Sequence, residues 1–160
     1  MSRQSGAWIA VAAAGLLATT VGAAAFAADE PANVIKYRQA YMRANGGHIT
    51  MIAAVVKGEV SWTDELAGHA HALHEQSKHL VRLFPEDSGK GDTEVQSAAL
   101  PVIWEQWSEF EEAANDFEAE SGKLVEAVES GDQTAIAQQL GALGQNGCGN
   151  CHETFREKQD

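Results

Sequence analysis

Apolar residues recur at alternating steps of four and three along a stretch that opens near Pro101 and runs to about Val128. These steps average close to the 3.6 residues of an α-helical turn, which places the apolar side chains on one face. The stretch therefore predicts one unbroken amphipathic helix that must bury this face against other elements. Its predicted inner face comprises Ile103, Trp107, Phe110, Ala114, Phe117, Ser121, Leu124 and Val128.

Three further segments have a helical period, and the sequence nowhere alternates with the period of two that is typical of strands. Four long helices with short connections predict an all-α fold, an antiparallel four-helix bundle. The expected helices span about 31–57, 64–84, 101–128 and 133–158, and the longest connection follows the second of them. The inner positions expected on the other three helices include Ile35, Arg38, Met42, Asn45, Ile49, Ile52, Val56, Leu66, Ala70, Leu73, Ser77, Leu80, Phe84, Ile136, Leu140, Leu143, Gly147, Cys151 and Phe155.

Glycines weaken the first and the last of these helices, because each costs about 1 kcal/mol relative to alanine in a helix interior. The pair at 46–47 interrupts the first helix, which indicates either the close approach of a flat group to the backbone or a simple kink. Packing within the bundle, and above all a bound group, must offset the cost in the last helix. That helix contains Gly141, Gly144, Gly147 and Gly149.

Residues 1–27 are predicted to be a secretory signal peptide. Arg3 gives a short positive start, an apolar Ala-rich run follows, and Ala25-Phe26-Ala27 has small residues where a signal peptidase reads the chain. Cleavage is expected before Ala28, which leaves one domain, 28–160, exported to the periplasm. An uncleaved membrane anchor is the alternative, although the apolar run is short for a bilayer span.

Close to the C-terminus, Cys148, Cys151 and His152 form a Cys-x-x-Cys-His pattern. In this pattern two thiols can add to the vinyl groups of a haem, and the adjacent imidazole can bind the iron. A zinc site would need four ligands and a thioredoxin-type pair would need a βαβ context, while a structural disulfide would not need the histidine. The motif therefore predicts one covalently attached haem c at one end of the core, between the last helix and the first.

The position of this motif on the last of four helices resembles the class II cytochromes c, the family of cytochrome c′ and cytochrome c-556. Three stretches carry the resemblance: Lys36-Tyr37-Arg38-Gln39 with Met42 after it, Ala99-Leu100-Pro101-Val102-Ile103-Trp104, and Cys148 to His152 followed by Phe155-Arg156. Together they extend over most of the chain after the predicted signal peptide.

In this family the residue four positions after the first-helix arginine faces the distal side of the iron, and here that residue is Met42. A bulky apolar residue leaves the iron five-coordinate and open to NO or CO, whereas methionine closes the site. The resemblance to cytochrome c-556 thus implies His152 and Met42 as axial ligands of a low-spin, one-electron carrier. Two alternatives remain: Met42 only packs in the core, or the protein is a five-coordinate, gas-binding cytochrome c′-like protein.

Two arginines are further candidates for contact with the haem. The resemblance implies that Arg38 pairs with a haem propionate, with an ordinary ion pair as the alternative. Arg156 lies one helical turn beyond His152, so it is expected to overhang the proximal side of the ring or else to be a solvated charge. Solvated or partly packed positions, rather than metal ligation, are expected for His69, His71, His74 and His79. His48 lies beyond the glycine pair, which argues against it as a ligand of the iron.

The formal net charge of −12 argues against binding to nucleic acid or to an anionic membrane surface. The sequence contains no Ser/His/Asp arrangement and no phosphate-binding loop, so no enzymatic activity is predicted. Redox protein partners with a positive docking face are expected. A homodimer stays open, because relatives in the c′ branch often dimerise through their first two helices.

Overall fold

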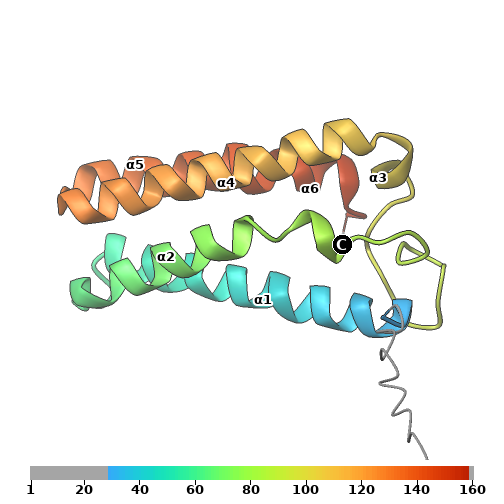
Figure 1. Ribbon diagram of the computed structural model, residues 1–160. Helices are drawn as coiled ribbons and strands as arrows, with labels where there is room; N and C mark the ends of the chain where they lie inside the picture. The colour runs from blue at the N-terminus through green and yellow to red at the C-terminus, as the bar shows by residue number, and fades with distance from the viewer. Residues whose placement is uncertain (1–28, 159–160) are drawn as a thin grey trace, which may run out of the picture.

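The computed structural model describes residues 29–158, and the predicted signal peptide lies outside them. Within this range the helices form four antiparallel rods that pack as a bundle (Figure 1). One pair of rods is built from α1 (Pro31–Val56) and α2 (Leu66–Ser77). The other pair is built from α4 (Trp107–Ser130) and a rod that begins with α5 (Gln133–Ala142). The predicted all-α bundle is confirmed.

The first rod, α1, forms as expected and runs without a break. Pro31 lies in its first turn, where the missing N–H of proline costs no hydrogen bond. A Cβ at Gly46 or Gly47 would meet no atom within 4 Å, so no protein group lies against these glycines. The inner face follows the predicted stripe: Ile35, Arg38, Asn45, Ile52 and Val55 are buried, and Met42, Ile49 and Val56 are half-buried against the core.

The second rod is shorter as a regular helix than the sequence predicts. It begins with η1 (Thr63–Glu65), and α2 ends at Ser77 instead of Phe84. The Ser77 hydroxyl donates to the His74 carbonyl at 2.7 Å, a local bond that competes with the helical ladder. The chain then turns through η2 (Val81–Leu83). The predicted inner residues are all buried nonetheless: Leu66, Ala70, Leu73, Ser77, Leu80 and Phe84.

The stretch predicted as one unbroken helix near 101–128 is divided into α3 (Val102–Glu105) and α4. Gln106, between them, has φ −124° and ψ 53°, which is outside the helical region. The break accompanies the packing of α3 on the preceding loop. Trp104 Nε1 donates to the Phe84 carbonyl at 3.2 Å, and a Cβ at Gly89 would lie only 2.8 Å from the Trp104 ring.

The fourth rod is also less regular than predicted, because α5 is followed by η3 (Leu143–Gly149) and α6 (Asn150–Phe155). The η3 segment is a π-helix, whose i→i+5 hydrogen bonds give a wider turn than the α-helix. From Leu143 to Phe155 the inner residues are spaced four apart, which overshoots an α-helical turn, and the wider turn keeps them on one face. The rod ends before the predicted 158 because Arg156 is extended, with φ −118° and ψ 135°.

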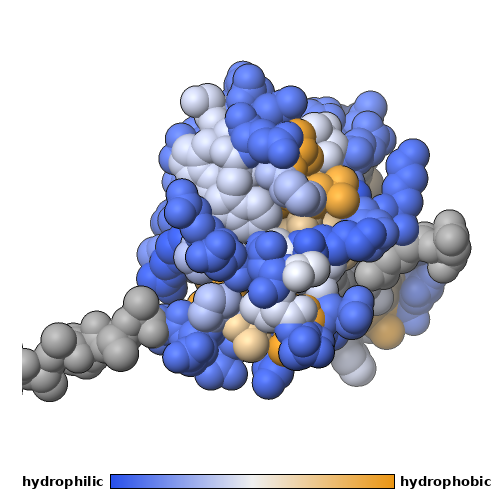
Figure 2. Space-filling view, turned by 90° about the vertical axis from the view of Figure 1, so that its right-hand side faces the viewer, coloured by the Kyte–Doolittle hydropathy of each residue, from blue (hydrophilic) through white to orange (hydrophobic). Residues whose placement is uncertain are grey.

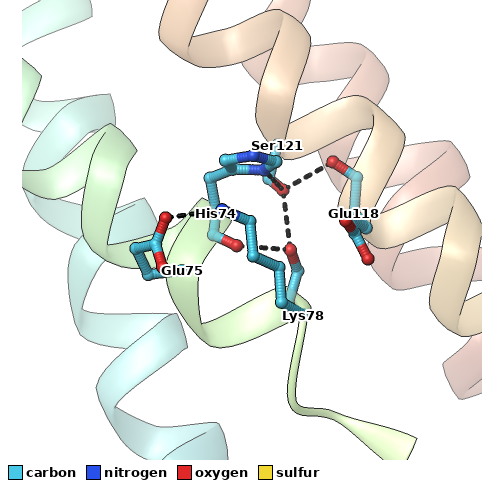
Figure 3. A network of polar contacts seen from close by, with 6 residues as sticks. His74, Glu75, Lys78, Glu118 and Ser121 are labelled. Carbon is cyan, nitrogen blue, oxygen red and sulfur yellow. Dashed lines mark hydrogen bonds and ion pairs between the residues drawn. The ribbon is translucent and has the colours of Figure 1, made fainter.

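Polar side chains help to join α2 to α4 (Figure 3). The Ser121 hydroxyl donates to the Glu118 carbonyl at 2.9 Å and lies 3.2 Å from both the Ser77 hydroxyl and His74 Nδ1. Both serines are buried, so the network satisfies groups that would otherwise be costly in the core. A Cβ at Gly122 would lie 3.3 Å from the His74 ring, so glycine permits the close approach of the two helices.

Figure 2 views the end of the bundle at which α3 and the start of α1 lie, and this face is mostly hydrophilic with small apolar areas. Across the described residues, exposed large hydrophobic side chains are Tyr37, Met51 and Trp62. No helix within 29–158 combines the length and apolar character needed to cross a membrane.

Candidate haem site

The Cys-x-x-Cys-His motif begins at the end of η3 and continues into α6. Gly147 precedes it, at a point where a Cβ would lie 2.9 Å from a methyl group of Leu143 and 3.2 Å from the Cα of Phe117 on α4. Only glycine fits there without a shift of the α4 backbone. The glycine that weakens the helix by propensity therefore sets how closely the motif approaches α4.

The three motif side chains, Cys148, Cys151 and His152, are half-buried. No disulfide joins Cys148 to Cys151. Burial raises the pKa of Cys148, and burial together with Cys148 raises the pKa of Cys151 to about 11, so both remain protonated at neutral pH. Burial, and secondarily Arg156, lowers the pKa of His152, which favours the neutral imidazole that binds metals. Two thiols and one imidazole are the donor set that a c-type haem requires.

Met42 lies on the face of α1 that points into the bundle. Its side chain is half-buried against the same apolar core that Cys151 contacts from α6. Asn45, nearly one turn further along, is buried, and its Oδ1 has no hydrogen-bond partner among the described residues. Buried amide oxygens normally have a partner, so this one fits a face that a further group completes. Met51, by contrast, is 43% exposed.

Arg38 lies one turn before Met42, but its guanidinium binds the connection that follows α2. Nη1 donates to the Leu83 carbonyl and to the Ser88 hydroxyl, both at 2.9 Å. Nη2 donates to the Ser88 carbonyl at 2.6 Å and to the Ser97 hydroxyl at 3.0 Å. These bonds use all four terminal N–H groups and leave only the Nε–H. The propionate contact stays a prediction, and Arg38 has an anchoring role that the sequence did not indicate.

Arg156 is exposed, directly after α6, and lies close enough to the motif to favour the thiolate of Cys151 and the neutral form of His152. Its backbone forms an isolated antiparallel bridge with Ala99, the residue before Leu100 in the segment that leads to α3. The chain beyond the motif is therefore fixed to an earlier part of the sequence. Contact between Arg156 and a haem stays a prediction.

Aromatic side chains from separate elements meet at this end of the bundle. The ring centroid of Phe110 lies 4.7 Å from that of Phe84 and 5.4 Å from that of Phe155, both in edge-to-face geometry, and 5.5 Å from that of Trp107. The guanidinium carbon of Arg38 lies 4.5 Å from the centroid of Phe84. A continuous series of contacts thus joins α1 to α6. The periodicity predicted that these rings are buried but gave no sign that they touch.

Comparison with known proteins gives a family and close relatives in two of its branches. A family profile described as cytochrome c′ matches residues 33–156. Cytochrome c′ of Pararhodospirillum photometricum is 34% identical over 128 residues, which are 79% of this chain and 98% of that protein. Cytochrome c-556 of Agrobacterium tumefaciens strain B2A is 33% identical over 129 residues, 80% of this chain and 100% of that protein.

The fold is also similar to solved structures of cytochromes c prime. The nitric oxide complex of a cytochrome c prime mutant from Alcaligenes xylosoxidans matches with a TM-score of 0.73 at 24% identity, covering 83% of this chain and 100% of that one. Members of the family are non-enzymatic proteins that bind one haem c covalently through Cys-x-x-Cys-His, and dimers occur among them. The matched range includes all four rods and the motif at 148–152. The chain therefore belongs to the cytochrome c′ family, the class II cytochromes c.

Proposed function

We propose that the protein is a periplasmic monohaem cytochrome that carries single electrons, with His152 and Met42 as the axial ligands of its iron. Cys148 and Cys151 would hold the haem through two thioether bonds. When bound, the haem supplies a one-electron Fe(III)/Fe(II) couple. The observation that carries the proposal is that Met42 on α1 and Cys151 on α6 pack against one common core.

The protonation state of His152 supports this assignment. Burial lowers its pKa, and a neutral imidazole keeps a lone pair for iron. A thioether opposite an imidazole stabilises ferrous iron and lets the iron change oxidation state with little rearrangement, because both positions stay filled. The methionine also needs no proton transfer to act as a ligand. These properties suit electron transfer.

The second candidate function is gas binding at a five-coordinate iron, with Met42 packing over an open position. Two observations favour it: cytochromes c′ are among the relatives, and a related fold was solved with nitric oxide. A half-buried methionine on an apolar stripe is also accounted for by core packing alone. The two functions therefore differ in what a single sulfur atom contacts.

The absorption spectrum of the ferric protein distinguishes them. With Met42 as ligand, the wild type should have the sulfur-to-iron charge-transfer band, and Met42→Ala should lose it and gain CO binding in the ferrous state. Met51→Ala is the matched control, because this methionine is exposed on the same helix, and its spectrum should not change. A wild type that lacks the band and binds CO rapidly would establish the gas-binding function instead.

Covalent attachment has its own test. Cys148→Ala combined with Cys151→Ala should leave no haem on the chain in a haem-stained denaturing gel, and either single substitution should weaken attachment. Haem retained by the double variant would overturn the role of the motif.

The partners and location follow from charge and from the N-terminal sequence. A net charge of −12 favours a redox partner with a positive docking face, so the electron-transfer rate should fall as ionic strength rises. If the chain is exported and cleaved as predicted, the mass of the purified protein should correspond to a chain that begins at Ala28. A homodimer is consistent with the dimers of relatives, and sedimentation of the haem-loaded protein tests for one.

A further inference from the structure

Two histidines outside the haem site meet across the contact between α1 and α2. His48 comes from α1 and His69 from α2, two neighbouring rods of Figure 1. Their Nδ1 atoms lie 3.0 Å apart, and their ring centroids are 5.2 Å apart with 48° between the planes. Both side chains are half-buried, so the pair lies at the edge of the core with access to solvent.

The contact requires one ring to donate a proton and the other to accept it. Two protonated rings would direct two N–H groups at one another, so the pair as seen contains at most one proton between the facing nitrogens. Burial, and secondarily His69, lowers the pKa of His48, which favours the neutral form of that ring. Two nitrogen atoms with ligand capacity thus converge on one point, and that geometry is set by the packing of two helices.

We propose that His48 and His69 form a bidentate site for a divalent late transition metal, with Cu²⁺ bound most tightly. The metal takes the place of the proton between the two Nδ1 atoms. In the ring that donated this proton, the proton moves from Nδ1 to Nε2, so both rings bind the metal as neutral imidazoles through Nδ1. Two metal–nitrogen bonds of about 2.0–2.1 Å across this separation enclose roughly 90–100° at the metal. This angle matches adjacent positions of a square-planar or tetragonal complex and is smaller than a tetrahedral angle.

The surroundings leave the other coordination positions to water. In the part of the chain that the structure describes, no three His, Cys, Asp or Glu side chains form a potential metal-binding group, so the pair acts alone among these residue types. A Cβ at Gly47 or Gly68, the residues before the two histidines, would meet no atom within 4 Å. The proposed site therefore has two protein ligands, unlike a closed structural zinc site with four.

Calorimetric titration of the haem-loaded protein with Cu²⁺ tests the proposal. One equivalent should bind, Zn²⁺ should bind more weakly as the Irving–Williams order requires, and His48→Gln or His69→Gln should lower the Cu²⁺ affinity at least tenfold. His71→Gln and His79→Gln are matched controls, because these exposed histidines lie on or just after α2 outside the pair, and they should leave the affinity unchanged. An unchanged affinity in both pair variants, or an equal loss in a control, would overturn the site.

A measurement on the wild type alone removes any dependence on how the variants fold. Bound Cu²⁺ is paramagnetic, so the amide signals of His48 and His69, and of their neighbours Gly47 and Gly68, should broaden in an NMR titration before those elsewhere in the chain. Broadening that centres elsewhere would refute the proposal. Both tests report on Cu²⁺ binding alone, so their outcome is independent of whether Met42 binds the haem iron.

Discussion

Arg38→Ala should lower the free energy of unfolding by about 3–5 kcal/mol, because four hydrogen bonds from a charged donor are lost and only the desolvation cost of the guanidinium is recovered. Arg38 is only 4% exposed and donates four hydrogen bonds. Each hydrogen bond from a charged donor contributes about 1.5–3 kcal/mol. Burial opposes them: it lowers the pKa of Arg38 from its ordinary value to about 10, which corresponds to roughly 3 kcal/mol of desolvation.

The four hydrogen bonds minus the desolvation cost give a range of destabilisation, and its lower part is expected because two of the acceptors have other partners. The Ser88 hydroxyl also donates to the Pro85 carbonyl at 2.7 Å, and the Ser97 hydroxyl lies 3.4 Å from the Ser88 carbonyl. The backbone carbonyls of Leu83 and Ser88 lose their arginine donors in the variant. Loss of its donor costs about 1–3 kcal/mol for the Leu83 carbonyl, whereas the Ser88 carbonyl keeps the Ser97 hydroxyl as a donor.

Urea denaturation of the haem-loaded protein, followed by far-UV circular dichroism, measures this effect. Arg43→Ala is the matched control, an exposed arginine on the same helix, and should change stability by less than about 0.5 kcal/mol. Arg38→Lys should recover only part of the loss, because one ammonium group does not reproduce the planar fork. A loss below about 1 kcal/mol for Arg38→Ala would refute the anchoring role.

Two further substitutions test separate parts of the bundle. Gly147→Ala should destabilise the protein by about 1–3 kcal/mol through overpacking against α4, as measured by thermal denaturation. Gly141→Ala is the control, because a Cβ there meets open space, and it should be neutral or stabilising by up to about 1 kcal/mol. An equal effect of both substitutions would contradict the close approach at Gly147. The hydrogen bond from Lys123, followed by that from Gln139, lowers the pKa of Glu120 in the folded protein. Glu120 therefore stabilises the fold above its unfolded pKa, and this stabilisation is lost as pH falls through the lower folded pKa. Urea midpoints between neutral pH and about pH 3 should therefore fall more steeply for the wild type than for Glu120→Gln, and parallel curves would count against the interaction.

The helical period predicted which residues are buried but not where the helices break. Burial follows the apolar stripe because one helix face must leave water whatever interrupts the backbone. The breaks coincide with specific features of the folded chain. These are the hydrogen bond of the Ser77 hydroxyl, the packing of Trp104 before Gln106, and the wide π-helical turn before the motif. None of these contacts produces a periodic signal in the sequence.

The motif could be predicted because the residues that its chemistry needs lie next to one another in the sequence. The partners of Arg38 could not be predicted. Ser88 and Ser97 lie 50 and 59 residues away, in a connection without periodicity. The pairing of His48 with His69 has the same origin, because it depends on the register between two helices. Local spacing thus predicted the candidate haem-binding residues, and long-range contacts determined that one of them, Arg38, also supports the fold.

The end of the bundle that contains the motif depends on side-chain contacts because α6 is too short to be stable by itself. Six residues form fewer than two helical turns, well below the length at which an isolated helix persists in water. Phe155 packs edge-to-face on Phe110, and an ion pair between Lys90 and Glu157 accompanies the backbone bridge at Arg156.

The same contacts extend through Phe110 and Phe84 to Arg38 on α1. Met42 lies one turn from that arginine, so the element that presents the proposed distal ligand and the element that presents Cys151 and His152 share one set of rings. A substitution that loosens this series should therefore disturb ligation on both sides of the iron together, even though none of the rings is itself a ligand.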